Sequence, residues 1–521
     1  MSHMSTGARV LVETALHAGV EICFANPGTT EMPIVEVLDS VPGLRVVLGL
    51  FEGVCTGAAD GWARMTGRPA ATLLHLGPGL ANGLANLHNA RRARSPVVNW
   101  IGDHARRHLE FDAPLTSDIA ALAASVGWVR TVNFADEMAK ASLAAVVTAL
   151  GLPGRVATLI LPADCQWALG PELLSTRPLP VQRELLNVAP REAAILLRMG
   201  RGGILLGGSA LTTRGLRAAA RVSAATDSKV WIETFPARQD CGRHLPFFPA
   251  LPYFPEQAVE ALADVTSLVL AGAREPVAFF AYPDQPSRLA PEGATMYPLV
   301  DPDSGVDATL ALEALAQELN APDMVTPART TPTFMPNGRP LTPDILCRAM
   351  AAFTPENGIV VNEAVTAGFT WNIEHASTAK PHTMLFVTGG AIGQGLPNAL
   401  GAALACPDRR VIAFQADGSG LYTLQALWSM ARENVDVTVV VCANRHYRIL
   451  QAELARAGVT EFGPKAQALT ALTNPVINWV NLAKGFGLPA FSVETDSELA
   501  DAFMRASKGR GPCLIEALLT A

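Results

Sequence analysis

The sequence is poor in charged and aromatic residues and has no long apolar run. Charged residues make up 17% of the 521 residues and hydrophobic residues 49%, which is too apolar for a disordered chain. No run of about 18 apolar residues predicts a membrane-spanning helix. The formal net charge of -7 gives no indication of a nucleic-acid-binding face, because phosphate binding needs a concentrated basic surface.

Paired cysteines are also absent. The eight cysteines occur singly and no Cys-x-x-Cys motif is present, so neither a zinc site nor a redox motif is predicted. Several cysteines lie in apolar runs, as Cys442 does after 439–441, where a thiol packs as a small hydrophobic group. We therefore expect reduced cysteines and a cytoplasmic protein.

Glycine (43) and proline (38), in contrast, are plentiful and suit many short turns. Between these turns, short apolar runs alternate with helical patterns, which predicts parallel sheets covered by helices on both faces. The runs that predict strands are 20–25, 70–75, 96–102, 156–162, 203–208, 267–272, 358–361, 411–414, 437–442 and 513–516. The predicted fold class is α/β, with three doubly wound parallel-sheet domains at 5–180, 190–325 and 340–521. Proline-rich connections at 171–190 and 322–340 separate them.

The strongest functional pattern lies between residues 388 and 450. The strand at 411–414 leads into Gln415-Ala416-Asp417-Gly418-Ser419-Gly420, and the strand at 437–442 leads into Ala443-Asn444-Arg445-His446-Tyr447. Ligands bind outside the carboxyl ends of parallel strands. Asp417, Asn444 and a backbone carbonyl near His446 can supply the oxygen ligands that Mg²⁺ takes. Gly418 and Ser419 open a helix, whose N-terminal amides favour phosphate oxygens.

This pattern resembles the thiamine-diphosphate enzyme superfamily, whose motif is Gly-Asp-Gly followed by Asn-Asn. The likeness is greatest to benzoylformate decarboxylase and the acetolactate synthase large subunit, and it runs essentially end to end. Ala416 and Ala443 depart from the motif, while Asp417 and Asn444 keep its ligand-bearing positions. The resemblance implies thiamine diphosphate and Mg²⁺ as cofactors. It also assigns the three domains as pyrimidine-binding, central and diphosphate-binding.

Two further parts of the cofactor site follow from the same resemblance. In the segment 388–397, the Gly390 carbonyl would accept a hydrogen bond from the aminopyrimidine, and Ile392 would be the apolar wedge between the two rings. Glu52 matches the carboxylate that exchanges a proton with the pyrimidine ring. We expect Glu52 on an apolar strand at 48–54, followed by a helix rich in small residues at 57–64.

The substrate end of the site is implied by likeness to benzoylformate decarboxylase. Thr29 stands where that family has a serine that contacts substrate, and His75 would relay protons or polarise the bound carbonyl. Asn82 and Asn86 match a helix facing the site, where packing is an equal explanation. The family's second catalytic histidine has no counterpart at 280–285, and His104 and His108 could substitute or be surface groups.

The sequence predicts a 2-oxo acid decarboxylase or carboligase resembling acetolactate synthase, with a benzoylformate-type decarboxylase that releases an aldehyde as the alternative. A cofactor-binding subunit with little catalysis stays open because of Ala416 and Ala443. A bound flavin is also left open, since the glycine pair at 207–208 is not a dinucleotide motif. The resemblance implies a homodimer or homotetramer, with Glu52 of one chain facing Asp417 of its partner.

Overall fold

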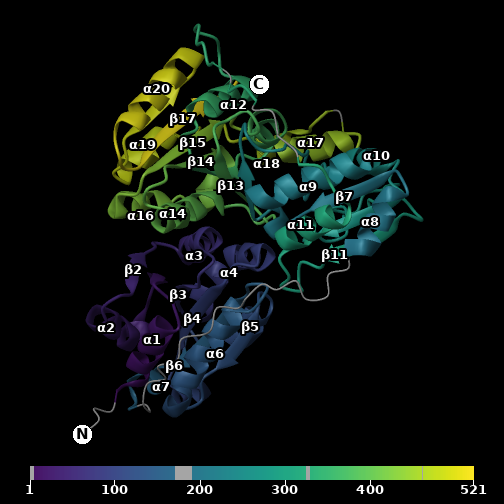
Figure 1. The fold of residues 1–521 in the computed structure, drawn as a ribbon. Coiled ribbons are helices and arrows are strands. Elements are labelled where there is room, and N and C mark those ends of the chain that lie inside the picture. The colour runs from purple at the N-terminus through teal and green to yellow at the C-terminus, as the bar shows by residue number, and fades with distance from the viewer. Residues whose placement is uncertain (1–4, 170–189, 324–328, 332, 460, 521) are drawn as a thin grey trace.

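The chain folds into three lobes, each built around one sheet (Figure 1). The computed structural model describes residues 5–169, 190–323, 329–331, 333–459 and 461–520. Most of the predicted linker at 171–190 therefore lies outside the described residues. The three sheets are parallel apart from one edge strand and are flanked by helices, which confirms the α/β fold class. No helix in the described ranges is both long and apolar enough to cross a membrane.

The N-terminal sheet is entirely parallel, with its six strands in the order β2-β1-β3-β4-β6-β5. Its strands are β1 (Ile22–Asn26), β2 (Arg45–Leu48), β3 (Ala70–His75), β4 (Val97–Asp103), β5 (Trp128–Thr131) and β6 (Val156–Pro162). Its helices are α1 (Gly7–His17), α2 (Met32–Ser40), α3 (Glu52–Thr66), α4 (Leu76–Ala93), α5 (Ile119–Ala124), α6 (Met138–Leu150) and α7 (Ala163–Trp167). The strands β3, β4 and β6 are buried along almost their whole length because both faces are covered.

The central sheet has four parallel strands in the order β11-β10-β7-β8. Its strands are β7 (Gly202–Leu206), β8 (Lys229–Ile232), β10 (Ser267–Ala271) and β11 (Thr295–Val300). Its helices are α8 (Pro190–Arg198), α9 (Thr213–Thr226), α10 (Pro255–Leu262) and α11 (Ala308–Glu318). The strand β9 (Arg238–Cys241) also lies within 190–325, but it pairs antiparallel with β13 of the C-terminal sheet. This pairing joins the central domain to the C-terminal domain.

The C-terminal sheet has seven strands in the order β16-β17-β15-β14-β12-β13-β9. Its own strands are β12 (Gly358–Glu363), β13 (His382–Phe386), β14 (Val411–Ala416), β15 (Val437–Ala443), β16 (Ala490–Val493) and β17 (Cys513–Leu518). The helices are α12 (Pro343–Phe353), α13 (Thr366–Thr370), α14 (Gly395–Ala405), α15 (Asp417–Gly420), α16 (Ala426–Glu433), α17 (Arg448–Arg456), α18 (Pro464–Thr470), α19 (Trp479–Gly485) and α20 (Asp496–Lys508). The pairing of β14 with β15 brings the two predicted ligand-bearing ends side by side.

The predicted strand at 48–54 is wrong. The strand β2 ends at Leu48, and Glu52 is the first residue of α3, which follows an extended Phe51. Apolar residues on successive turns of α3 are buried against the sheet and against the C-terminal domain. A short apolar stretch that is buried on all sides shows no periodicity that distinguishes a strand from a helix. The prediction of a strand at 48–54 failed for this reason.

Helices α3 and α14 form the contact between the N-terminal and C-terminal domains, and Figure 1 shows them facing each other. Glycines on both helices allow a close approach. A Cβ on Gly57 would lie 2.6 Å from Pro397 Cβ, and one on Gly61 would lie 2.7 Å from Asn398 Cα. The two domains therefore share one hydrophobic core across this contact.

Replacing Gly61 with alanine should destabilise the protein, because the new methyl group meets backbone that cannot move away. We expect a loss of about 1–3 kcal/mol in the free energy of unfolding, the usual cost of overpacking. Gly485→Ala is the matched control, since a Cβ at this helical glycine meets nothing within 4 Å. Equal denaturant midpoints for the two variants would contradict the account of this interface.

Candidate active site

Asp417 lies at the carboxyl end of β14, where it bridges to the loop after β15. One carboxylate oxygen accepts the Gly418 N–H at 2.9 Å and the other accepts the Arg445 N–H at 2.7 Å. Asp417 is 4% exposed, and burial raises the pKa of its carboxyl group. Each oxygen keeps a free lone pair, so the carboxylate can still bind a cation.

Asn444 and His446 lie on the neighbouring loop. The Asn444 side-chain oxygen accepts the His446 N–H at 2.9 Å, while the His446 ring lies with Nδ1 2.9 Å from the Asn444 carbonyl oxygen. The described residues contain no cluster of three or more His, Cys, Asp or Glu side chains around one point. The oxygen donors here are instead one carboxylate, one amide and backbone carbonyls. This set fits Mg²⁺ bound together with phosphate oxygens.

The residues on either side of Asp417 adopt ordinary backbone conformations. Ala416 has φ -76° and ψ 146°, which any residue adopts, so the alanine in place of the family's glycine introduces no strain. Gly418 lies against the Tyr447 ring, where a Cβ would be 2.5 Å from a ring carbon. The Ser419 hydroxyl points inward, accepting a hydrogen bond from the Gln415 amide at 2.6 Å. Its predicted contact with the cofactor stays a prediction.

The loop at 388–395, here called the cofactor loop, carries Gly390 and Ile392. Gly390 has φ +75°, a left-handed conformation that favours glycine, and Ile392 is half-buried. The loop is held by Asn89 of α4: its side-chain nitrogen donates to the Ala391 carbonyl at 2.7 Å, and its side-chain oxygen accepts the Gly389 N–H at 3.1 Å. The sequence did not single out Asn89, although it continues the asparagine series at 82 and 86 on one helix face.

Glu52 begins α3 and lies beside His75. The Asn82 amide donates to the Glu52 carboxylate at 3.0 Å, so Asn82 is an immediate neighbour of the predicted acid. Gly79 separates the two functional side chains. A Cβ there would lie 3.3 Å from Glu52 Oε1 and 3.5 Å from His75 Cβ. Asn86 lies one turn further along and donates to the carbonyls of both Gly53 and Gly393.

His75 is paired with Glu31, which the sequence analysis did not identify as functional. The His75 Nδ1 lies 2.8 Å from Glu31 Oε2, and the same oxygen accepts the Gly28 N–H at 2.7 Å. Glu31 is fully buried, and Thr30 donates to its other oxygen at 2.6 Å. Thr29 is exposed at the start of this turn. Because Glu31 occupies Nδ1, Nε2 is the nitrogen of His75 left for proton exchange.

The family is decided by comparison with known proteins. Residues 5–122 match the model of the thiamine pyrophosphate enzyme N-terminal TPP binding domain, and residues 367–517 match that of the C-terminal TPP binding domain. The chain belongs to the thiamine pyrophosphate enzyme family. The site above therefore belongs to a cofactor-binding fold of known type, and the predicted family resemblance is confirmed.

Similar proteins cover the whole chain. A Mycobacterium tuberculosis protein named "Putative acetolactate synthase large subunit IlvX" is 47% identical over 98% of this chain and 99% of its own. The benzoylformate decarboxylase of Pseudomonas aeruginosa is 30% identical over 96% of both chains. Among solved structures, a Rhodococcus jostii thiamine diphosphate-dependent 4-hydroxybenzoylformate decarboxylase superposes with a TM-score of 0.86, at 26% identity and 99% coverage of both chains.

In this thiamine pyrophosphate enzyme, the central domain places aromatic rings next to the cofactor loop. A Cβ on Gly390 would lie 3.5 Å from the Phe279 ring, and Phe279 packs on Phe235 and Tyr253 with ring centroids 5.2 and 5.3 Å apart. An apolar wall thus lies beside the cofactor loop, and Phe279 immediately precedes the segment 280–285, which contains no histidine. His104 follows β4, two residues beyond Gly102, which pairs with His75, and its ring centroid lies 5.4 Å from that of His108. The roles of these two histidines stay untested.

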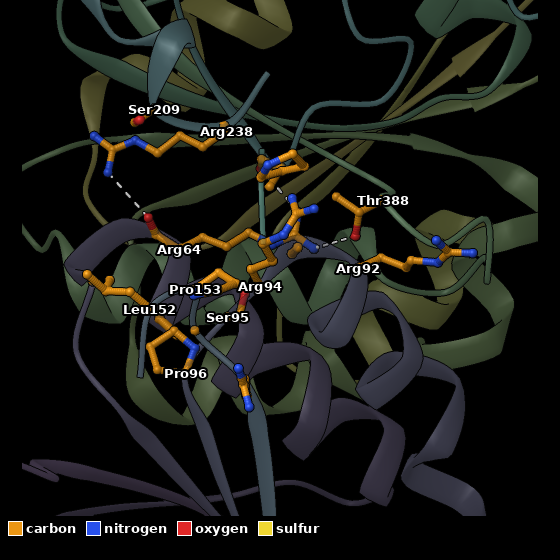
Figure 2. A pocket seen from close by; sticks show the side chains of 18 of the residues that line it. Arg64, Arg92, Arg94, Ser95, Pro96, Leu152, Pro153, Ser209, Arg238 and Thr388 are labelled. Atoms are coloured by element: carbon orange, nitrogen blue, oxygen red, sulfur yellow. Dashed lines mark hydrogen bonds between the residues drawn. The ribbon is translucent and has the colours of Figure 1, made fainter. Parts of the chain in front are cut away.

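A hollow of about 1000 Å³ opens where the three domains meet (Figure 2). The hollow follows the carboxyl ends of β7, β8, β10 and β11, the strands of the central domain. Ligands of parallel sheets bind at such ends. Figure 2 shows Arg64 and Arg94 on its walls; Arg64 is paired with Asp60 at 2.6 Å and Arg94 with Asp303 at 3.1 Å. A bound flavin, which the sequence left open, stays untested.

Asp417→Asn is expected to weaken binding of thiamine diphosphate in the presence of Mg²⁺ by at least about tenfold, because it removes the one carboxylate among the proposed protein ligands of the cation. Titration calorimetry on the purified variant measures this directly. Asp436→Asn is a suitable control, since Asp436 pairs with Arg410 just before the opposite end of β15. Unchanged affinity in Asp417→Asn would show that the cation site lies elsewhere.

Proposed function

We propose that this protein uses thiamine diphosphate and Mg²⁺ to decarboxylate a 2-oxo acid and to join the product to a second carbonyl compound, as acetolactate synthase does. The observation that carries the proposal is the placement of Glu52 and His75 on two sides of Gly79, with Glu31 behind His75. The Glu52 carboxylate can exchange a proton with a pyrimidine ring, and His75 can hydrogen-bond the carbonyl or carboxylate of a substrate.

The chain's own residues divide the proton transfers between them. Glu52 is 8% exposed, and its carboxylate is held by the Asn82 amide, so it is positioned to exchange a proton with one ring nitrogen. His75, fixed through Nδ1 by Glu31, presents Nε2 toward substrate. When bound, thiamine diphosphate supplies the carbon nucleophile for the 2-oxo carbonyl and accepts the electrons left as CO₂ departs.

The apolar wall at Phe279 favours carboligation over simple release of an aldehyde. A phenyl ring cannot donate a proton to the decarboxylated carbon, whereas it can exclude water and pack against the apolar part of the second carbonyl compound. The relative named "Putative acetolactate synthase large subunit IlvX" also supports carboligation over simple decarboxylation. A benzoylformate-type decarboxylase stays the alternative, supported by the relative of that name and by the aromatic character of the wall.

Two substrates test the proposal. Pyruvate and benzoylformate are supplied separately, and CO₂, acetolactate and aldehyde are measured. We expect CO₂ release with at least one of them. Turnover of neither would remove both substrate choices, and a protein that binds thiamine diphosphate without any turnover would instead be the cofactor-binding subunit left open by the sequence.

The Glu52→Gln variant should lose at least about a hundredfold in kcat, because an amide cannot exchange the proton that a general acid or base provides. Its affinity for the cofactor, measured by calorimetry, should change far less. The matched control is Glu21→Gln, an exposed carboxylate of the same domain. Wild-type turnover in Glu52→Gln would show that the assignment of the acid is wrong.

Each active site is proposed to form between Glu52 of one chain and Asp417 of its partner. Glu52→Gln and Asp417→Asn chains, purified together with two different tags, should then regain activity that neither has alone. One site of each mixed dimer would be intact, so about half the wild-type activity per mixed dimer is expected. If both residues serve the same chain, the mixed dimers contain no intact site and activity stays absent.

A further inference from the structure

The second half of the cofactor loop is held by one buried carboxylate, that of Glu363. Glu363 is the last residue of β12 and is 3% exposed. Its Oε1 accepts the Gly393 N–H at 2.5 Å, and its Oε2 accepts the Gly395 N–H. Each oxygen takes one backbone donor, so the carboxylate fixes two points of the chain, between Ile392 and the start of α14.

No cation compensates the Glu363 charge among the described residues. Its surroundings are neutral: the Gln415 amide, the Ser419 hydroxyl and the two glycine N–H groups. Burial accordingly raises the pKa of Glu363 to about 7. A buried, uncompensated carboxylate costs folding free energy. Fold stability alone therefore does not explain a carboxylate at this position.

Geometry explains it better. Two N–H groups that point at two separate oxygens need two acceptors, and a carboxylate is the only side chain of this length that provides them. A glutamine would turn an NH₂ group toward one of the two donors. The backbone has little space to move away from such an NH₂ group, since a Cβ on Gly395 would lie 2.8 Å from Glu363 Oε2.

The clamped backbone is unusual in conformation. Gly393 has φ +94°, and its carbonyl accepts hydrogen bonds from Thr423 at 2.8 Å and from Asn86 at 3.3 Å. Asn89 holds the first half of the loop at Gly389 and Ala391. The Gly390 carbonyl and the Ile392 side chain are thus presented between two anchors, of which Glu363 is one.

We propose that Glu363 is a positioning residue for thiamine diphosphate, which acts by holding the backbone at 393–395 so that Gly390 and Ile392 are in place before the cofactor binds. The inference rests on the proposed function, because it assigns the cofactor loop to thiamine diphosphate. Glu363 acts through the loop and not on the reacting atoms.

The test compares Glu363→Gln with Asp496→Asn. Asp496 is an equally buried carboxylate in the same domain that accepts backbone N–H groups of residues 337–339, away from the cofactor loop. Two quantities are measured: the dissociation constant of thiamine diphosphate with Mg²⁺ by calorimetry, and amide hydrogen exchange of the 388–395 peptide in the cofactor-free protein. Neither requires turnover.

We expect Glu363→Gln to bind thiamine diphosphate at least about tenfold more weakly than wild type at pH 8, the usual effect of losing a hydrogen bond to a charged group. Its loop should exchange faster, while its unfolding temperature changes little, because a buried charge is removed as well. Asp496→Asn should keep wild-type affinity and loop exchange. Glu363→Asp, which keeps the charge but reaches only one donor, should also weaken binding and serves if the glutamine variant fails to fold.

The pH profile adds a readout specific to the carboxylate. Above pH 7 the wild-type group is ionised and accepts both N–H groups, whereas below pH 7 it is protonated and resembles the glutamine variant. The affinity ratio of wild type to Glu363→Gln should therefore shrink as the pH falls from about 8 to about 6. No other titratable side chain contacts the Glu363 carboxylate among the described residues.

Wild-type affinity and wild-type loop exchange in Glu363→Gln would overturn the inference. So would an equal loss of affinity in Asp496→Asn, because the effect would then be a general weakening of the domain. Failure of the wild-type protein to bind thiamine diphosphate would contradict the proposed function itself, and the positioning role with it.

Discussion

The close approach of α3 and α14 is the contact on which the rest of the site depends. Gly61 of α3 and Gly401 of α14 let the two helices touch backbone to backbone. Inside the contact, the buried Asp60–Arg64 ion pair is satisfied by polar groups of both domains, including Gln394. Each helix starts at the functional edge of its own sheet: α3 begins with Glu52, and α14 follows the cofactor loop. Packing the helices therefore fixes the acid and the loop of one chain relative to each other, and in the proposed dimer these two groups serve neighbouring sites.

Helix α4 extends this constraint along one polar stripe. Asn82 contacts Glu52, Asn86 contacts the carbonyls of Gly53 and Gly393, and Asn89 holds the cofactor loop. The spacing of four and then three residues keeps all three amides on one face of the helix. If the two halves of each site come from different chains, α4 touches the loop of its own chain's site and the acid that serves the partner's site.

Much of this was predictable from sequence because it depends on local pattern. Apolar runs between glycine-rich turns marked the parallel strands, and the rule that such strands end at one edge placed Asp417 beside Asn444. The partners of the functional groups were not predictable. Glu31 and Glu363 belong to no motif identified in the sequence, and their contacts are with residues far along the chain. The helix at Glu52 was mistaken for a strand because its buried residues show no period.

The proposed site has thiamine diphosphate spanning the two domain types, with its diphosphate at Asp417 and Asn444 and its pyrimidine ring at Glu52. A structure of the protein with thiamine diphosphate and Mg²⁺ bound tests this most directly. We expect the cation on the Asp417 carboxylate and the Glu52 carboxylate within hydrogen-bonding distance of a pyrimidine nitrogen. A cofactor whose pyrimidine ring meets no carboxylate, or whose cation lies away from Asp417, would contradict it.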